Sequence, residues 1–521
     1  MNARRSLGIA AASLLVSCAA AAGDAAPLPK GHAVFTTDFD AADSLAAWQG
    51  GARLEAGCLA VERAEGATGA NALLPLPAQA LRDHTLLCAA RVRAENVSAK
   101  PQPWNGIKLM LIIEGPDRRE WPQADIPAGS FPWRRAAFNA RIPADVKTVT
   151  LLLGLEAVTG KVWFDDLSIT IARPPRASVP KPAPGPAFKG HALPRLRGAM
   201  ISPNIDAAGL EVLGREWNAN LIRWQLIRYI GAGKRAPLGE FDPWLESELS
   251  KLDAALPHCR RFGLHVVLDL HSPPGGKATA SGYIGSDDRL FTDRASQDKF
   301  VDAWRRMAAR YKGERAIWGF DLANEPVESL VEEGCDDWHA LAERAAKAVR
   351  AVDPARVLII EPPDWGGPDG FRDFQPIDVS NVVYSVHMYV PGAFTHQTIH
   401  GNEGGRTYPG DIDGTRWDKA RLEAALAPVI EFQRRFNVHI YAGEFSAIRW
   451  APAGSACRWL ADVIDIFEAH GWDWSYHAFR EWDGWSVEHG PDRNDRAPAA
   501  APTDRQLLLR KWYARNEKPA W

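Results

Sequence analysis

The second part of the chain alternates short apolar runs with stretches in which apolar residues recur every three or four positions. Runs of the first kind predict buried strands, and stretches of the second kind predict amphipathic helices. The eight predicted strands span residues 195–201, 219–225, 264–271, 317–325, 356–362, 381–389, 439–445 and 472–479. Strands that alternate with helices form parallel sheets, and eight such repeats indicate a closed barrel. We therefore predict an α/β fold, a (β/α)8 TIM barrel, over residues 190–521.

Two stretches between these strands carry the helical pattern clearly. Phe300, Trp304, Met307 and Tyr311 recur at helical spacing between the third and fourth strands. This aromatic stripe predicts a helix that faces the core rather than a binding surface. A single helix is predicted over residues 417–436, before the seventh strand.

Residues 33–172 show a different pattern. Short apolar runs such as 107–113 and 146–153 are separated by turns rich in Gly, Pro and Asp, which predicts an all-β jelly-roll sandwich. Residues 173–189 follow with six prolines and few side chains that could pack. This segment is predicted to be a stiff, extended linker between two domains.

The N-terminus has the pattern of an export signal over residues 1–22. Positive charges precede an apolar segment that is too short to span a bilayer. The run Leu-Val-Ser-Cys matches a bacterial lipobox, so one hypothesis is a lipidated Cys18 that tethers the protein to a membrane. The alternative is ordinary signal peptidase cleavage in the small-residue run 19–23. Either way we expect an exported protein: periplasmic, an outer-membrane lipoprotein, or extracellular.

Composition narrows the classes of partner. The chain has 521 residues, 46% apolar and 24% charged, with a formal net charge of −3 and no long basic run. Nothing in this balance indicates nucleic acid, and we expect a monomer without a cofactor. Apart from Cys18, the cysteines show no metal-binding spacing. Cys58 and Cys88 lie in one β-rich region and are expected either to pair in an oxidising compartment or to remain buried thiols.

Two of the predicted strands end in a glutamate, Glu325 and Glu444. Charged residues are rarely buried unless paired, so packing alone does not explain a carboxylate at the end of an apolar run. Each could form a structural salt bridge. The carboxyl ends of barrel strands meet at one face, however, and two carboxylates that converge there can cleave a glycosidic bond. The pair therefore predicts a glycosidase.

Other polar residues end predicted strands at the same face. Each has an ordinary explanation alone: an arginine can pair with a core carboxylate, an asparagine can cap a helix, and a lone histidine is usually structural. Their concentration at the strand ends favours a functional site. They are Arg223, His271, Asn324, His387 and Tyr389.

The barrel resembles glycoside hydrolase family 5, the cellulase-like family of retaining glycosidases, over about residues 195–515. Asn-Glu-Pro ends the fourth strand, His-x-Tyr the sixth and Gly-Glu-Phe the seventh. The resemblance implies that Glu325 is the acid/base, that Glu444 is the nucleophile and that no metal takes part. It implies that Arg223 supports the nucleophile. It gives substrate-binding positions to His271, Asn324, His387 and Tyr389.

The chain departs from the family pattern at the eighth strand. The resemblance implies a tryptophan there as the floor of the cleavage subsite, and His477 stands in that place. Trp482 and Trp485 follow in a tryptophan-rich stretch, and we assign the substrate-binding role to Trp482. The opening and closing strands of the β-rich region, 35–39 and 160–169, resemble a carbohydrate-binding module. Many such modules only flank a catalytic domain.

The resemblance implies a retaining β-glycosidase that acts on a β-linked polysaccharide or oligosaccharide, foremost an endo-β-1,4-glucanase. Mannan, xyloglucan and a glycosphingolipid headgroup are alternatives within the family. A different class is a catalytically silent glycan-binding surface protein. A third is a metal-dependent hydrolase that uses His271 and His387, although no His-x-His pair ends the first strand.

Overall fold

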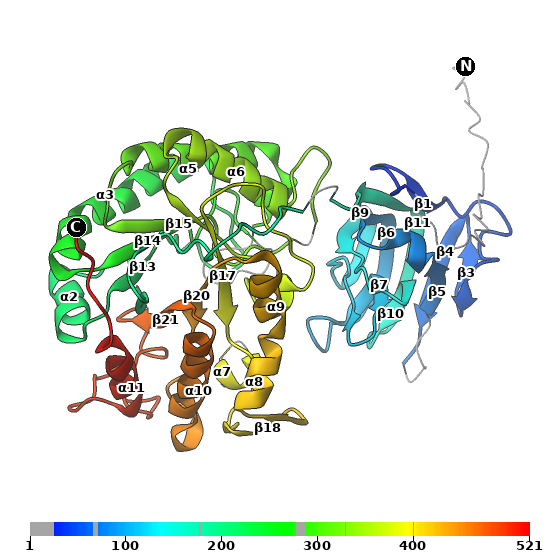
Figure 1. Ribbon diagram of the computed structural model, residues 1–521. Coiled ribbons are helices and arrows are strands. Elements are labelled where there is room, and N and C mark those ends of the chain that lie inside the picture. The colour runs from blue at the N-terminus through cyan, green and yellow to red at the C-terminus, as the bar shows by residue number, and fades with distance from the viewer. Residues whose placement is uncertain (1–25, 66–70, 177–178, 278–286, 329, 400) are drawn as a thin grey trace. The chain divides into compact units, whose positions relative to one another are not determined.

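The computed structural model describes residues 26–65, 71–176, 179–277, 287–328, 330–399 and 401–521 (Figure 1). The predicted signal peptide and lipobox, with Cys18, lie outside these residues. The chain divides into two compact units. The first comprises Met1–Trp121, Pro127–Arg135 and Arg141–Pro175, and the second comprises Pro122–Ile126, Ala136–Ala140 and Arg176–Trp521. Within the described ranges, no helix is both long and apolar enough to cross a membrane.

The first unit consists of two antiparallel sheets. One has the order β3-β4-β11-β6-β9, with β1 paired to β11. Its strands are β1 (Ala33–Thr37), β3 (Arg53–Glu55), β4 (Cys58–Arg63), β6 (Thr85–Val97), β9 (Gly129–Arg141) and β11 (Gly160–Arg173). The other, in the order β2-β5-β10-β7-β8, contains β2 (Gln49–Gly50), β5 (Asn71–Leu76), β7 (Gly106–Glu114), β8 (Arg119–Glu120) and β10 (Thr148–Glu156). The prediction of a β-rich N-terminal region is confirmed.

The strands of the first unit supply its core. On β7 and β10, Leu109, Leu111, Leu151 and Leu153 are fully buried, and Met110 and Leu152 between them are only 6% and 8% exposed. Both faces of these strands are therefore covered at their middle, because successive residues of a strand point to opposite faces. The only helix of the sandwich in the described ranges is the short α1 (Ala78–Leu81).

Cys58 and Cys88 are free thiols. Cys58 begins β4 and Cys88 lies in β6, and both strands pair with β11, one on each side. Strands two places apart are separated by about 9–10 Å, which exceeds the Cα spacing of about 4.4–6.8 Å that a disulfide needs. Both cysteines therefore remain free, as the second of the two expectations has it, but only Cys88 is buried, whereas Cys58 is partly exposed. Burial raises the pKa of the Cys88 thiol, which keeps it protonated and unreactive.

The second unit is a closed parallel barrel of eight strands, which confirms the predicted fold. The order around the barrel follows the sequence. The strands are β12 (Arg197–Ile201), β13 (Leu221–Gln225), β14 (His265–Asp269), β15 (Ile317–Asp321), β16 (Val357–Ile360), β17 (Val382–Met388), β20 (Ile440–Phe445) and β21 (Asp473–Phe479). Each predicted strand is present, but β14, β15, β16 and β17 end before the polar residues that close the apolar runs. Those polar residues therefore lie at the rim.

Helices lie around the strands of the barrel (Figure 1). The longer ones are α3 (Phe241–Phe262), α5 (Arg294–Arg310), α6 (Trp338–Val352), α9 (Ala427–Phe436), α10 (Ser455–Ala469) and α11 (Asp504–Tyr513). On α5, Phe300, Trp304 and Met307 are fully buried, which confirms the predicted core-facing stripe. Asp293 caps this helix by accepting hydrogen bonds from the backbone N–H groups of the first turn.

The prediction of one helix over residues 417–436 is wrong. Trp417 ends the short strand β19 (Thr415–Trp417), which pairs with β18 (Gly410–Ile412). Asp418 then caps α8 (Lys419–Ala425), and α9 begins separately at Ala427. Pro428 stands in the first turn of α9, where a residue without an N–H group is tolerated, whereas in the middle of one long helix it would remove a hydrogen bond.

Candidate active site

The inward side chains of the barrel form layers, because residues two apart on a strand share a face. The apolar layer in the interior includes Leu221, Val267 and Ile359, which are fully buried. Two positions further along the same strands or just past their ends stand Arg223, Asp269 and Glu361, also fully buried. A charged layer thus lies directly on the apolar one, towards the carboxyl ends of the strands. Functional residues are expected at this end of a barrel.

Glu444 enters this layer because of a β-bulge. Val386 of β17 is paired with Ala442 of β20, but the next residue, His387, is paired with Glu444, so Gly443 is the extra residue. In strict alternation Glu444 would share the face of Ala442, whereas the bulge turns it towards the interior. Glycine is required at position 443 because the ring of His387 lies close to its backbone: a Cβ there would lie 3.0 Å from Nε2 of His387.

Both oxygens of Glu444 are held. Nη1 of Arg223 donates to Oε1 at 2.5 Å, and the Tyr389 hydroxyl donates to Oε2 at 2.9 Å. Burial by itself would raise the pKa of the Glu444 carboxyl, but His387, His477 and Arg223 outweigh it and hold that pKa well below the ordinary value. Glu444 is therefore ionised.

Arg223 also binds the other acidic groups of the charged layer. Its guanidinium donates to Asp321 at 2.9 and 3.1 Å and to Glu361 at 3.1 Å, and it lies 3.2 Å from Asp269. It donates to Oδ1 of Asn324 at 3.1 Å as well. Burial opposes its charge, but the surrounding carboxylates raise the pKa of Arg223 well above the ordinary value. A permanent cation therefore holds Glu444 and the neighbouring carboxylates together.

Glu325 has a left-handed backbone, with φ of 46°. Its N–H group donates to Oε2 of Glu361 at 2.8 Å, which holds this strained conformation. Oε1 lies 3.0 Å from Nδ1 of His387, and Oε2 accepts from the ammonium of Lys277 at 3.3 Å. Burial would raise the pKa of Glu325, but Lys277 and His387 outweigh it and lower that pKa to about 2.

His271 forms a short chain beside these residues. Its Nδ1 lies 2.9 Å from Oδ2 of Asp269, and the amide of Asn324 lies 3.2 Å from its Nε2. If Asn324 donates through its amide nitrogen, Nε2 accepts and Nδ1–H donates to Asp269. Asn324 is thus fixed between Arg223 and His271, next to Glu325.

The structure brings the predicted residues Arg223, His271, Asn324, Glu325, His387, Tyr389 and Glu444 together at one end of the barrel. Trp482 lies further away. Trp485 has its ring centroid 5.7 Å from His477 and 6.1 Å from Tyr389, and only 7% of it is exposed. Trp482 packs on the outer side of Trp485 at 5.6 Å and is 41% exposed.

Five further charged residues of the site were not singled out from the sequence: Asp269, Asp321, Glu361, Glu481 and Lys277. Glu361 ends the apolar run 357–360 just as Glu325 and Glu444 end theirs, so the same signal identifies it. Glu481 opens the tryptophan-rich stretch after β21 and lies 2.9 Å from Nε2 of His477. Lys277 follows Pro-Pro-Gly-Gly in the loop after β14, and no local pattern marks it.

One oxygen of Glu325, one oxygen of Glu444 and one nitrogen of His387 lie within 4.8 Å of one another. Such a cluster has the donor types of a metal site. Both carboxylates already face cations, however: Arg223 bonds Glu444, and Lys277 bonds Glu325. A metal ion would add a like charge to this cluster, so the donor set suits two carboxylates that act on a bound molecule.

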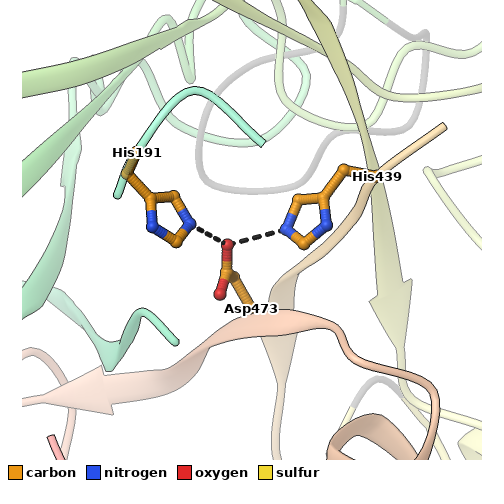
Figure 2. Close-up of side chains that lie close together, drawn as sticks. All are labelled: His191, His439 and Asp473. Atoms are coloured by element: carbon orange, nitrogen blue, oxygen red, sulfur yellow. Dashed lines mark hydrogen bonds and ion pairs between the residues drawn. The ribbon is translucent and has the colours of Figure 1, made fainter. Parts of the chain in front are cut away.

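A second cluster lies at the opposite end of the barrel, where the strands begin. Figure 2 shows His191 and His439 directed at one oxygen of Asp473, with each Nε2 at 2.7 Å from it. The other carboxylate oxygen accepts from the N–H group of Leu196 at 2.8 Å. A metal-binding histidine usually donates its second ring N–H to an acceptor. Nδ1 of His191 is buried and has no hydrogen-bond partner among the described residues. A carboxylate shared by two imidazole donors therefore fits better than a metal.

The first unit offers no free stacking surface at its central tryptophan. Trp163 on β11 is only 4% exposed, because the guanidinium of Arg93 lies 4.0 Å and the ammonium of Lys161 lies 4.6 Å from its ring centroid. A sugar ring would have to displace these cations to stack on it.

Comparison with known proteins gives consistent results. The sequence model of the family Cellulase (glycosyl hydrolase family 5) matches residues 189–481. Endoglucanase C of Acetivibrio thermocellus is 32% identical over 262 residues, which cover 44% of this chain and 73% of the relative. Cellodextrinase A of Ruminococcus flavefaciens is 22% identical over 246 residues, or 46% and 69% of the two chains. A crystal structure described as a glycoside hydrolase superposes with a TM-score of 0.50 at 25% identity, covering 61% of this chain and 99% of the other.

Proposed function

We propose, on the premise that this chain belongs to glycosyl hydrolase family 5, the cellulase family, that it is an endo-β-1,4-glucanase with a double-displacement mechanism. Its membership makes it a glycoside hydrolase. The observation that carries the finer proposal is the pair of carboxylates, Glu325 and Glu444, whose nearest oxygens lie within 4.8 Å of each other at the carboxyl end of the barrel.

In the proposed first step, Glu444 attacks the anomeric carbon and Glu325 protonates the leaving oxygen. A short distance between the carboxyl groups supports this role for Glu444: retaining enzymes have a separation of about 5–5.5 Å, whereas inverting enzymes need about 6.5–9.5 Å for a water molecule. In the second step Glu325 removes a proton from water, which attacks the glycosyl-enzyme bond and releases Glu444.

His387 explains how Glu325 can act as an acid although its pKa is low. Its Nδ1 lies 3.0 Å from Oε1 of Glu325, so the two groups share one proton. In the resting site the proton remains on the imidazole, whose pKa is raised well above the ordinary value, against the effect of burial, by Glu361 and Glu444. A bound sugar excludes water and favours the neutral pair, a protonated Glu325 beside a neutral His387.

The choice of glucan rests on the relatives. The most similar ones reported above are an endoglucanase and a cellodextrinase, and an insoluble or polymeric substrate fits the export signal predicted at the N-terminus. A role outside the cytoplasm is part of the proposal, because polymeric glucan does not cross a cell membrane.

The test is hydrolysis of soluble β-1,4-glucan, mixed-linkage glucan, mannan and xylan, with products separated by length. We expect β-1,4-glucan to be cut internally, so that its viscosity falls before monosaccharide accumulates. Early NMR spectra should show the β-anomer before mutarotation. A preference for mannan or xylan, or release of monosaccharide alone, would overturn the substrate or the endo mode, and the α-anomer would overturn the mechanism.

The nucleophile is tested separately. A 2-deoxy-2-fluoro glycoside with a good leaving group should label Glu444, and Glu444→Gln should reduce turnover below detection while the circular dichroism spectrum stays unchanged. Glu431→Gln, which alters an exposed glutamate on α9, is the matched control and should retain full activity. Labelling of another residue would contradict the assignment.

A further inference from the structure

We propose that His477 and Glu481 form a positioning pair for the carboxylate of Glu444, acting through the hydroxyl of Tyr389. His477 lies on β21, next to β20, which carries Glu444. The inference rests on the proposed role of Glu444 as the nucleophile. It adds two residues that hold the proton of Tyr389 in place.

The contacts form a continuous chain. Nε2 of His477 lies 2.9 Å from Oε2 of Glu481. Its Nδ1 is in short contact with the hydroxyl of Tyr389 and lies 3.4 Å from Oε2 of Glu444. The same hydroxyl lies 2.9 Å from that oxygen. The side chains of Glu444, His477 and Glu481 are 4%, 12% and 14% exposed, and Tyr389 is half-buried, so water has little access to these bonds.

The hydrogen bonds that link Glu481, His477, Tyr389 and Glu444 are compatible with only one protonation state of His477. A neutral imidazole that donates from Nε2 to Glu481 leaves Nδ1 without a proton. The single hydroxyl proton of Tyr389 would then face two acceptors, Nδ1 and Glu444. The other neutral tautomer points a lone pair of Nε2 at the Glu481 carboxylate. Only the imidazolium satisfies every contact: Nε2–H donates to Glu481, Nδ1–H donates to the Tyr389 oxygen, and Tyr389 donates to Glu444.

The surrounding charges agree with this state. Burial disfavours the imidazolium, but Glu444 and Glu481 outweigh it and raise the pKa of His477 above its ordinary value. Glu481 is itself held ionised, because His477 and a hydrogen bond from Gln225 outweigh the effect of burial and lower its pKa. Within the part of the chain that the structure describes, the titratable and charged groups that face His477, Glu481, Tyr389 and Glu444 from the neighbouring elements include Arg223, Tyr229, His271, Glu325, His387 and His396.

The arrangement has a direct consequence for the nucleophile. While His477 is protonated, Tyr389 must donate to Oε2 of Glu444, and Arg223 fixes the other oxygen, so the carboxylate plane is held. When His477 loses its proton, Tyr389 can donate to Nδ1 instead, and Oε2 loses its hydrogen bond. Nucleophilic attack should therefore slow as the pH rises through the pKa of His477.

The first experiment needs no substrate. Ring signals of histidine in the full-length protein, labelled with ¹³C, are followed by NMR over pH and assigned with His477→Gln. We expect His477 to titrate at least about one pH unit lower in Glu481→Gln than in the wild type, because the variant removes a charge at hydrogen-bond distance. Glu423→Gln is the matched control, since Glu423 lies 3.4 Å from the ring of the surface residue His470. An unchanged His477 titration in Glu481→Gln would overturn the pair.

The second experiment measures the rate at which the 2-deoxy-2-fluoro glycoside labels Glu444, as a function of pH. This leaving group needs little protonation, so the basic limb reports the nucleophile rather than the acid. We expect that limb to move to lower pH in Glu481→Gln by the same shift that NMR records, and to disappear in His477→Gln, with a slower rate at every pH. A basic limb that stays in place would show that the pair does not position Glu444.

The two experiments separate this inference from the proposed function. Failure to label Glu444 in the wild type would contradict its role as nucleophile, whereas the NMR titration would still decide the hydrogen-bond chain. Normal labelling with an unmoved limb would leave the nucleophile in place and overturn the pair.

Discussion

The ammonium of Lys277, a residue of the loop that follows β14, lies 3.3 Å from Oε2 of Glu325. Lys277 is only 2% exposed, and its ammonium also lies 5.6 Å from the ring centroid of Trp365. A buried cation at this distance stabilises the ionised form of Glu325. It therefore opposes the protonated form that an acid catalyst needs.

Replacing this cation should move the pH profile. In Lys277→Met the pKa of Glu325 should rise from about 2, because the largest group that opposes burial is lost. A general acid is active below its pKa, so the basic limb of kcat/KM on an unactivated glucan should move to higher pH. Lys299→Met, which removes a surface ammonium paired with Asp242, is the control. An unchanged limb in Lys277→Met would show that Lys277 leaves Glu325 when substrate binds.

Glu325→Ala should slow hydrolysis of natural glucan by about 10²–10⁴-fold, the usual contribution of a general acid or base. An activated aryl glycoside departs with little protonation, so its first step should be slowed much less. Added azide should then restore turnover and give a glycosyl azide, because azide attacks without a general base. The exposed Glu403→Ala should behave as the wild type in both assays. Equal losses on activated and natural substrates would contradict the acid/base role.

Arg223→Met should destabilise the barrel strongly. Arg223 is fully buried and lies within 3.2 Å of four carboxylates, and removing it leaves buried charges without compensation. Losses of about 3–5 kcal/mol are typical when one partner of a buried ion pair is removed. Arg215→Met breaks an exposed pair with Glu211 on the surface and should cost less than about 1 kcal/mol. Urea unfolding measures both, and equal losses would contradict this account.

Gly366→Ala should disturb the site through Glu361. Gly366 has φ of +64°, and a Cβ there would lie 2.5 Å from Oε2 of Glu361, the oxygen that accepts the N–H group of Glu325. We expect a loss of about 1–3 kcal/mol from the strained backbone and a drop in kcat of tenfold or more as Glu325 shifts. Gly392→Ala, where a Cβ meets nothing within 4 Å, should change neither. Unfolding and steady-state kinetics of the two variants decide between these outcomes.

Asp473 should give the barrel a stability that depends on pH. Burial opposes its charge, but His439 and His191 outweigh it and lower the pKa of Asp473 below its ordinary value. The stability from this group is therefore fully present above the ordinary aspartate pKa of about 3.9 and is lost as the pH falls below it. The loss in the free energy of unfolding caused by Asp473→Asn should thus be roughly 1 kcal/mol smaller at pH 3 than at pH 7. The exposed Asp465→Asn is the control, and a cost for Asp473→Asn that is independent of pH would contradict the shift.

The sequence alone determined the barrel and the level of the site within it. Eight apolar runs alternate with helical patterns, and this periodicity is local, because burial on both faces of a parallel strand requires a continuous apolar run. The polar residues near the ends of these runs, from Arg223 to Glu444, could be placed at the ends of the strands, because each apolar run marks where its strand lies. The prediction of a single helix over 417–436 failed because Asp418 caps a helix that begins only at Lys419, and because Pro428 stands in the first turn of a second helix.

Only the tertiary structure decided which way these side chains point and what they meet. The alternation of a strand would turn Glu444 outward, and the bulge at Gly443 that turns it inward arises from pairing with β17, more than fifty residues earlier in the chain. Lys277 reaches Glu325, and Glu481 reaches His477, from loops, where no period fixes the direction of a side chain. Arg223 gathers acidic groups from four other strands or their ends, because closure of the barrel brings together residues that are far apart in sequence. Local patterns specify the elements, whereas contacts of this kind depend on the relative placement of elements and cannot be derived from any one of them.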